Sequence, residues 1–227
     1  SYIVDIYRKE VKGQNNIYNL ALYISLFPQL IAGPIVRYHD VVEQITERRH
    51  SIALFTSGLQ RFIIGLSKKI LIANALGKVA DNIFALAVND LTMPLAWIGI
   101  LAYALQIYFD FSGYSDMAIG LGRMFGFRFY ENFNYPYIAT SLREFWKRWH
   151  ISLSKWFRDY IYIPLGGNRV SVKRVYINLI TVFFLTGIWH GASLNFIFWG
   201  MFHGFFLTCE HFGFSKILEK LWKPFQH

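Results

Sequence analysis

The sequence predicts an all-α, polytopic membrane protein in which re-entrant or interfacial helices accompany the membrane spans. Of its 227 residues, 54% are hydrophobic and only 16% are charged, against a usual charged fraction of about 25%. The apolar residues come in long blocks, which favours membrane spans over a water-soluble core. We expect residues 1–227 to form a single membrane-embedded domain. Because the chain starts at Ser1 in the middle of a pattern, we interpret it as a fragment lacking N-terminal and C-terminal helices.

The first apolar block, Ile17 to Val36, is about as long as one span, since roughly 20 helical residues cross a bilayer. Pro28 and the pair Gly33-Pro34 interrupt it. A helix broken inside a membrane needs protein or water to satisfy its freed backbone groups. The polar residues 37–49 are expected to form a loop or a surface helix.

Residues 51–88 mix apolar side chains at helical spacing with three basic residues, Arg61, Lys68 and Lys69. This pattern fits a buried helix whose lysines snorkel, and it fits an amphipathic helix at the membrane interface equally well. The sequence leaves both interpretations open.

Residues 94–109 form the clearest span, because Gln106 is their only polar residue and the apolar pattern continues towards Leu121. Asp110 follows within this span. An acidic side chain at membrane depth is a functional candidate by default, so Asp110 is predicted to bind substrate. The alternative is that Asp110 pairs with a nearby basic residue and only holds helices together.

The block from Val175 to Cys209 contains 35 residues without Asp, Glu, Lys or Arg. One helix of this length would reach roughly 50 Å, whereas the hydrocarbon core is about 30 Å thick. Two shorter pieces broken near Gly191 fit better, and His190 then lies about 24 Å along the first piece, deep in the membrane. The tail, residues 210–227, has the pattern of an amphipathic surface helix.

The net charge of +9 is concentrated in one segment, since ten basic and three acidic residues between Arg123 and Arg174 contribute +7 of it. Excess Lys and Arg mark the cytoplasmic loops of membrane proteins, so this segment is predicted to face the cytoplasm. A nucleic-acid-binding protein would carry its basic face on a polar domain, so no nucleic-acid partner is expected. The single cysteine, Cys209, excludes an internal disulfide and a cysteine-rich metal centre.

Residues 143–168 carry the densest mixture of basic and aromatic side chains. If they form one helix, five polar residues three or four positions apart share a face. These are Arg143, Lys147, His150, Ser154 and Arg158. Such a face could bind the phosphate or carboxylate of a substrate, or anionic lipid headgroups, and the sequence favours neither.

His190, in the sequence GIWHG, is the candidate for chemistry within the uncharged block. Histidine titrates near neutrality and can act as a general base, while Gly191 would let a substrate or another backbone approach closely. The alternative is a buried histidine bonded to a carbonyl group. The common hydrolase, zinc-peptidase and nucleotide-binding motifs are absent, and His203 and His211 complete no recognisable metal set, so no metal or bound cofactor is expected.

Four motifs run through most of the chain. They are PQLIAGPIVRYHD at 28–40, YFDFSGYSDMAIGLG at 108–122, WHISLSKWFRDYIYIPLGGNR at 149–169 and NLITVFFLTGIWHGA at 178–192. Together they resemble the membrane-bound O-acyltransferase family. Within it they look closest to the bacterial branch of alginate O-acetyltransferases, which is related to the D-alanyl transfer proteins of teichoic acid.

This resemblance implies a multi-helix membrane fold around a central funnel or tunnel. It maps the family's catalytic histidine onto His190 and its second polar active-site position onto His150. The substrate-binding residues that we expect beside them are Trp189, Trp149, Arg143, Lys147, Arg158 and Asp110.

The resemblance also implies a reaction, the transfer of an acyl group, foremost acetyl, from a cytoplasmic thioester such as acetyl-CoA to a hydroxyl. His190 would act as general base, and His150 would position the acceptor or stabilise the developing oxyanion. The acceptor would be an exported polysaccharide or a periplasmic or extracellular relay protein. The protein would be a multi-pass, lipid-surrounded protein of the bacterial cytoplasmic (inner) membrane. D-alanyl or other small-acyl transfer to a cell-wall polymer is the alternative.

Two functions of other classes stay open. A transporter or channel would line a polar pathway with Asp110, His150 and His190, although the sequence shows no inverted repeat to support it. A non-catalytic scaffold of a polysaccharide-export complex would need neither histidine.

Overall fold

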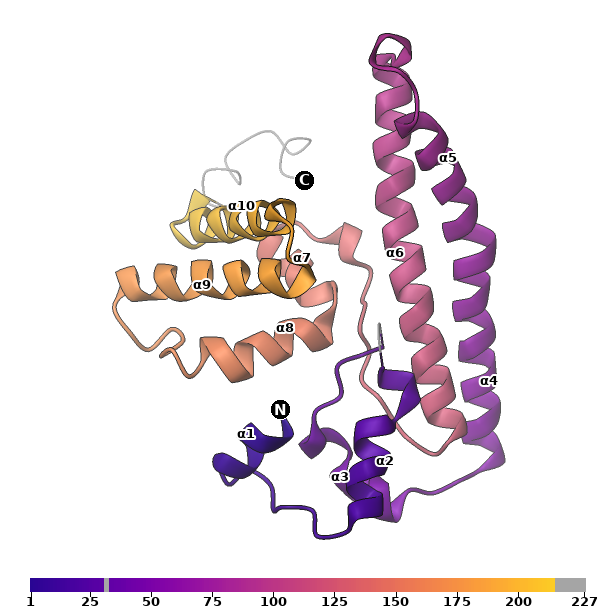
Figure 1. Cartoon of the computed structure of the whole chain (residues 1–227), viewed down its shortest axis with the longest axis vertical. Helices are drawn as coiled ribbons and strands as arrows, with labels where there is room; N and C mark the ends of the chain where they lie inside the picture. Colours follow the sequence, from indigo (N-terminus) through magenta and orange to yellow (C-terminus); the bar gives the residue numbers. More distant parts are fainter. Residues whose placement is uncertain (31–32, 215–227) are drawn as a thin grey trace. The chain divides into compact units, whose positions relative to one another are not determined.

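The computed structural model describes residues 1–30 and 33–214, and every regular element within them is a helix (Figure 1). The predicted all-α class is therefore confirmed for these residues. The predicted tail helix falls mostly on residues 215–227, outside the described residues. The chain divides into two compact units, residues 1–131 and 132–227, and each is described by itself below. The expectation of one domain over the whole chain stays a prediction.

The first unit begins with four short helices, α1 (Tyr2–Tyr7), α2 (Ile17–Ser25), the 3-10 helix η1 (Phe27–Gln29) and α3 (Tyr38–Glu47). The Asn16 side chain accepts hydrogen bonds from the first turn of α2, which is the usual role of an N-cap. α2 ends before Pro28, so the first apolar block is broken where proline predicted it. Of the two options for residues 37–49, the helix is the one observed, as α3.

The remainder of this unit is built on α6 (Met93–Met124), whose 32 residues make it long and apolar enough to cross a membrane. The predicted span from Pro94 is therefore confirmed as a helix. Against it pack α4 (Ile52–Ser67), the π-helical segment η2 (Lys68–Ala73) and α5 (Asn74–Phe84) (Figure 1). A 3-10 turn, η3 (Val88–Asp90), precedes α6.

Glycines allow α4 and α6 to approach closely. A Cβ atom built on Gly65 of α4 would lie 2.5 Å from the carbonyl oxygen of Gly113, and one built on Gly58 would lie 2.6 Å from that of Gly120. Both glycine pairs are spaced by seven residues along each helix, so they meet at two successive levels. Small residues at such contacts are typical of helix packing in membranes, where backbone proximity replaces the hydrophobic effect.

The second unit contains η4 (Pro136–Ile138), α7 (Leu142–Arg148), α8 (Ile151–Phe157), the π-helical η5 (Arg158–Tyr162), α9 (Val172–His190) and α10 (Leu194–His211). α9 and α10 lie side by side as a hairpin (Figure 1). The predicted break near Gly191 is confirmed. Among the described residues, α6 and α9 are the two helices with the length and composition of a membrane span.

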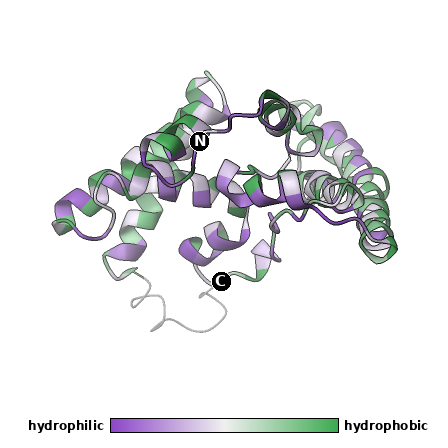
Figure 2. Cartoon of the chain, turned by 90° about the horizontal axis from the view of Figure 1, so that it is seen from below, coloured by the Kyte–Doolittle hydropathy of each residue, from purple (hydrophilic) through white to green (hydrophobic). Residues whose placement is uncertain are grey.

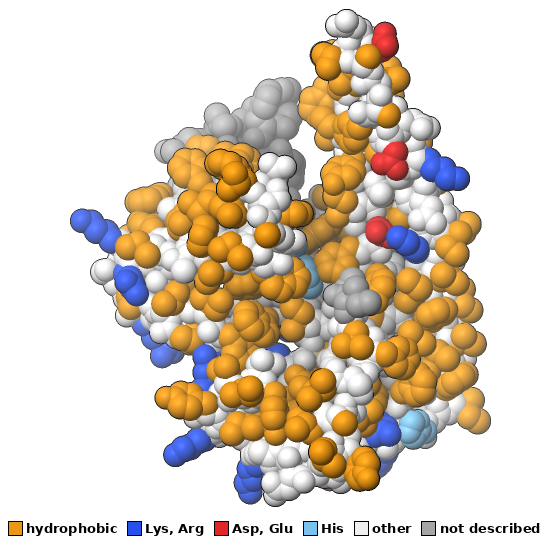
Figure 3. All heavy atoms as spheres, viewed as in Figure 1, with side chains coloured by type: hydrophobic (Ala, Val, Ile, Leu, Met, Phe, Trp, Pro, Cys, Tyr) orange, Lys and Arg blue, Asp and Glu red, His pale blue; other side chains and the backbone are white. Residues whose placement is uncertain are grey.

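Hydrophobic side chains dominate the surfaces of both units. Figure 2 shows hydrophobic residues along the long helices, and Figure 3 shows hydrophobic side chains over much of the visible face with few charges between them. On α6 the large exposed hydrophobic residues include Trp97, Ile98, Ile100, Leu101 and Tyr103. Lipid tails would cover such surfaces without the cost of exposing them to water, in agreement with two helices of spanning length.

The single helix considered for residues 143–168 is not observed. α7 ends at Arg148, and α8 starts at Ile151 after His150 adopts the left-handed conformation (φ 44°, ψ 56°). At the break, the N–H of Ile151 donates to the carbonyl of Asn132 instead of to a helical partner, at 2.9 Å. Hydrogen bonds to residues 132–134 have therefore replaced those of a continuous helix.

Candidate functional site

Two predicted site residues meet at one end of the second unit. α8 and η5 run antiparallel to α9 (Figure 1), so the beginning of α8 and the end of α9 lie together. There the ring centroids of His150 and Trp189 are 6.1 Å apart, and Trp189 precedes His190. His190 is also close enough for its charge to disfavour protonation of His150. The structure thus brings His150, Trp189 and His190 together.

His150 is held by a buried asparagine that the sequence analysis missed. His150 is 3% exposed and Asn132 is fully buried. The Oδ1 atom of Asn132 lies 3.1 Å from Nδ1 of His150, and it also accepts the backbone N–H of Ser152 at 3.1 Å and the Ser152 hydroxyl at 2.8 Å. No motif marked Asn132, because its partner is 18 residues away and the pairing depends on the chain folding back.

The electrostatics of this place keep His150 neutral. His150 belongs to the segment between the two helices of spanning length. Burial, and to a smaller extent the neighbouring His190, lowers the pKa of His150 to about 3. Burial acts this way because the imidazolium loses its hydration in a low-dielectric environment. At neutral pH His150 therefore carries one ring proton.

His190 lies among aromatic rings rather than in a hydrogen-bond network. Its ring is 4.8 Å from that of Trp199 in an edge-on arrangement and 6.0 Å from that of Phe196 in a stacked one. His190 is exposed, and within residues 1–30 and 33–214 no hydrogen bond holds either ring nitrogen. Its nitrogens are thus available to a substrate. Trp199 was missed by the sequence analysis, because a tryptophan in an apolar block gives no functional signal.

Two of the predicted basic residues line a cavity of about 200 Å³ where α7, α8, α9 and α10 meet. Arg143 and Lys147 contribute the charges, and the remaining wall is mostly apolar, formed by Trp146, Leu153, Ser154, Phe157, Val182, Phe183, Thr186 and Leu207. The indole N–H of Trp146 is buried and has no hydrogen-bond partner among the described residues. The cavity is therefore suited to a molecule with an apolar body, an oxygen acceptor and an anionic group.

The remaining predicted site residues are placed elsewhere. Arg158 is exposed and pairs with the neighbouring Asp159 at 2.7 Å, so it does not share a face with Arg143 and Lys147. Trp149 stacks on Phe145, with ring centroids 5.6 Å apart. Asp110 belongs to the first unit and pairs with Lys69, both side chains being 42% exposed. That pair agrees with the alternative in which Asp110 holds helices together.

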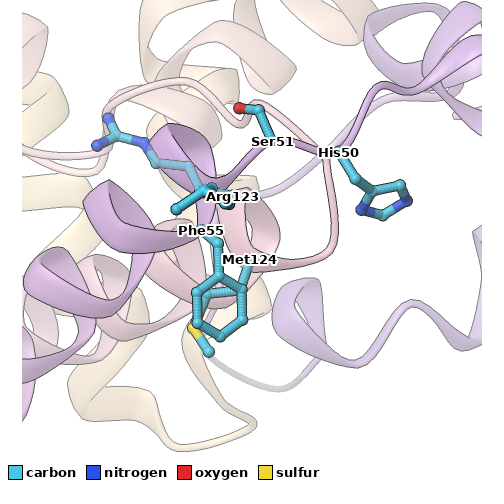
Figure 4. Close-up of a pocket in the computed structure, with 6 residues that line it drawn as sticks. His50, Ser51, Phe55, Arg123 and Met124 are labelled. Atoms are coloured by element: carbon cyan, nitrogen blue, oxygen red, sulfur yellow. The ribbon is translucent and has the colours of Figure 1, made fainter.

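The first unit offers two other features. A cavity of about 380 Å³, shown in Figure 4, lies between the start of α4 and the end of α6, and its lining includes His50, Arg123 and Met124. Among the described residues, one group could offer metal ligands, namely Asp5, Glu10 and His39. Nδ1 of His39 lies 3.5 Å from Oδ2 of Asp5. Neither feature contains a predicted site residue.

Comparison with known proteins gives one family match. The model of the membrane-bound O-acyltransferase family matches residues 8–217. That range includes all the helices from α2 to α10, and it includes Asn132, His150 and His190.

Curated relatives are similar over nearly the whole chain. A "probable alginate O-acetylase" of Azotobacter vinelandii is 53% identical over 210 residues, 92% of this chain and 42% of that protein. A peptidoglycan O-acetyltransferase of Helicobacter pylori is 45% identical over 88% of this chain and 40% of its own length. A teichoic acid D-alanyltransferase of Bacillus subtilis is 32% identical over 94% of this chain and 56% of its own. The chain thus spans about two fifths of the length of the alginate and peptidoglycan relatives.

Proposed function

This chain belongs to the membrane-bound O-acyltransferase family, and on that premise we propose that it carries the active centre of an O-acetyltransferase that moves an acetyl group from a thioester to a hydroxyl. The higher identity to the two O-acetylating relatives than to the D-alanyltransferase supports acetyl as the group transferred. We further propose that the full protein is a multi-pass protein of the bacterial inner membrane.

The observation that carries this proposal is the meeting of His150 and His190 beside Trp189. His150, which precedes α8, and His190, which ends α9, would provide one hydrogen-bonding group and one base in the same neighbourhood, as acyl transfer to a hydroxyl requires. His190 is the last residue of a helix of spanning length, which supports a centre at the end of that helix.

In the proposed reaction, His190 takes the proton of the acceptor hydroxyl as the oxygen attacks the thioester carbonyl. A carbon–oxygen bond forms, and the carbon–sulfur bond breaks when the tetrahedral intermediate collapses. The thiolate then leaves and recovers the proton from His190, so the ester and the free thiol are the products. General base catalysis of this kind contributes about 10²–10⁴-fold to the rate.

The cavity beside α7 fits the donor side of this reaction. Its apolar wall suits the arm of a thioester such as acetyl-CoA, and the N–H of Trp146 would donate to an amide or carbonyl oxygen of that arm. Arg143 and Lys147 would face the phosphates. The basic segment between α6 and α9 supports entry from the cytoplasm. The acceptor would then be an exported polysaccharide, or a relay protein that carries the acetyl group outward.

The test is acetyl transfer by the full-length protein reconstituted in lipid vesicles with radiolabelled acetyl-CoA. Bacterial exopolysaccharide and cell-wall fractions serve as acceptors. We expect His190→Ala to reduce labelled ester by at least about 100-fold, whereas His39→Ala, a histidine of the first unit, should leave it near the wild-type level. Wild-type transfer by His190→Ala would overturn the catalytic assignment. A transporter would instead move label without ester formation, and a scaffold would keep its phenotype without either histidine.

A further inference from the structure

The hydrogen bonds around Asn132 determine which nitrogen of His150 carries its proton, and we propose that Asn132 is a positioning residue. It would hold His150 as the tautomer protonated on Nδ1. The unprotonated Nε2 could then receive a hydrogen bond from the hydroxyl compound that is acetylated. This inference rests on the proposed function only for the identity of that acceptor. The tautomer itself follows from the structure.

The first step is the orientation of the Asn132 amide. One of its two terminal atoms lies 3.1 Å from the backbone nitrogen of Ser152, whose N–H points to it. A backbone N–H is always a donor, so this amide atom must be the oxygen and not the nitrogen. The Ser152 hydroxyl, 2.8 Å away, donates to the same oxygen.

The second step follows for His150. Its Nδ1 lies 3.1 Å from that oxygen, which can only accept, so Nδ1 must be the donor. In a neutral imidazole the other nitrogen, Nε2, is then unprotonated. The rival arrangement has Ser152 donating to an unprotonated Nδ1. That contact is long, at 3.5 Å, and it would set two lone pairs against each other 3.1 Å apart.

The backbone of Asn132 reinforces the same arrangement. Its carbonyl accepts the N–H of Ile151 at 2.9 Å, directly after the left-handed His150. A non-glycine residue in that conformation carries strain of about 1–2 kcal/mol, which surrounding contacts must offset. Asn132 therefore holds both the main chain and the imidazole of His150.

The tautomer narrows the role of His150. Two roles were expected of His150. A neutral ring without a proton on Nε2 can position the acetyl acceptor by receiving a hydrogen bond from it, but it cannot donate a hydrogen bond to an oxyanion. The reacting hydroxyl gives its only proton to His190 in the proposed reaction. If the acetyl acceptor donates to Nε2, it must do so with a second donor, such as the neighbouring hydroxyl of a sugar ring.

The direct test is solid-state NMR of the full-length protein in lipid bilayers with ¹⁵N-labelled histidine. The signal of His150 is identified by its loss in His150→Gln. We expect the neutral, Nδ1-protonated tautomer at pH 7. A neutral Nε2-protonated tautomer, or an imidazolium, would overturn the inference. This readout requires no catalysis, so it stands or fails separately from the proposed function.

Variants of Asn132 give the kinetic test. Asn132→Leu removes the amide oxygen that accepts the hydrogen bond from His150. We expect acetyl transfer to fall about 10- to 100-fold, by analogy with other residues that orient a functional histidine. KM for acetyl-CoA should change less than twofold. Asn132→Asp keeps an oxygen that can accept the hydrogen bond from His150 and adds a negative charge that favours the imidazolium form of His150. Because the neutral ring is the active form, the acid limb of the pH–rate profile of this variant should move to higher pH.

The matched control is Asn134→Leu, because Asn134 lies two residues away in the same segment but is exposed. It should retain the wild-type rate, tautomer and pH profile. If Asn132→Leu does not fold, the NMR signal of His150 in the wild type and the pH–rate profile of Asn132→Asp still test the positioning role of Asn132. An unshifted profile in Asn132→Asp, or a wild-type rate in Asn132→Leu, would refute the positioning role.

Discussion

Gly187 of α9 and Phe196 of α10 pack so closely that a Cβ atom built on Gly187 would lie 2.5 Å from the carbonyl oxygen of Phe196. The contact is three residues before His190. The backbone of α10 therefore sets the position of the end of α9, and with it the position of the imidazole. Any side chain at this position must push the two helices apart.

We predict that Gly187→Ala destabilises the protein by about 1–3 kcal/mol, as overpacking typically does, and lowers acetyl transfer more than this loss of folded protein explains. Thermal unfolding in detergent and transfer per folded molecule measure the two effects. Gly13→Ala is the control, because a Cβ there would meet its nearest neighbour at an ordinary 4.0 Å. If both variants behave alike, the α9–α10 contact does not position His190.

A second prediction concerns acid. In the folded protein burial lowers the pKa of His150 to about 3, whereas the unfolded chain has the ordinary value of 6.5. As pH falls below about 6.5 the unfolded state binds this proton first, so the stabilisation is present above 6.5 and is lost progressively towards pH 3. The maximum slope for one proton is about 1.4 kcal/mol per pH unit.

The measurement compares unfolding of the wild type and of His150→Gln between pH 4 and 7. The stability of the wild type should fall more steeply than that of the variant as pH falls. Above pH 7 the two slopes should be equal. Glu144, whose pKa is lowered to about 2 mainly by a backbone hydrogen bond from Thr140, is present in both proteins and cancels from the comparison. Parallel pH curves would contradict the neutral, buried state of His150.

The sequence predicted much of the helical arrangement and little of the site's geometry. The α6 helix and the break at Gly191 follow from apolar length against bilayer thickness, a constraint that residue composition expresses directly. The break at Trp149–His150 could not be predicted in this way, because Arg143, Lys147 and Ser154 keep helical spacing across it. It depends on hydrogen bonds that Asn132 accepts from residues 150–152, and only the folded chain brings Asn132 near them. For the same reason the single helical face expected to carry Arg143, Lys147 and Arg158 is not observed.

The cavity beside α7 yields a third prediction. If Lys147 faces the phosphates of the donor, Lys147→Ala should raise KM for acetyl-CoA by about 10-fold or more with little change in kcat, because a charge-assisted contact contributes about 1.5–3 kcal/mol. Lys173→Ala removes the same charge from an exposed position at the start of α9 and serves as control. Equal effects of the two variants would indicate general attraction by the basic segment rather than contact in the cavity.

A fourth prediction separates the two acids of α6. Asp116 is 5% exposed and lies 2.8 Å from Nε of Arg61 and 2.6 Å from Nζ of Lys68. Asp116→Ala removes the carboxylate that joins Lys68 to Arg61 and leaves Arg61 with Glu131. We expect a loss of about 3 kcal/mol, as for other buried pairs broken on one side. Asp110 and Lys69 are half exposed, so Asp110→Ala should cost less than about 1 kcal/mol.

The same pair of variants decides the role of Asp110. If Asp110 only joins α6 to η2 through Lys69, then Asp110→Ala should keep the wild-type KM and kcat of acetyl transfer along with its near-wild-type stability. If Asp110 binds substrate, the stability should still be unchanged while KM rises several-fold. Because the ion pair with Lys69 already occupies the carboxylate of Asp110, we expect the first result. Steady-state kinetics of Asp110→Ala measure KM and kcat, and unfolding curves of Asp110→Ala and Asp116→Ala compare the two losses of stability.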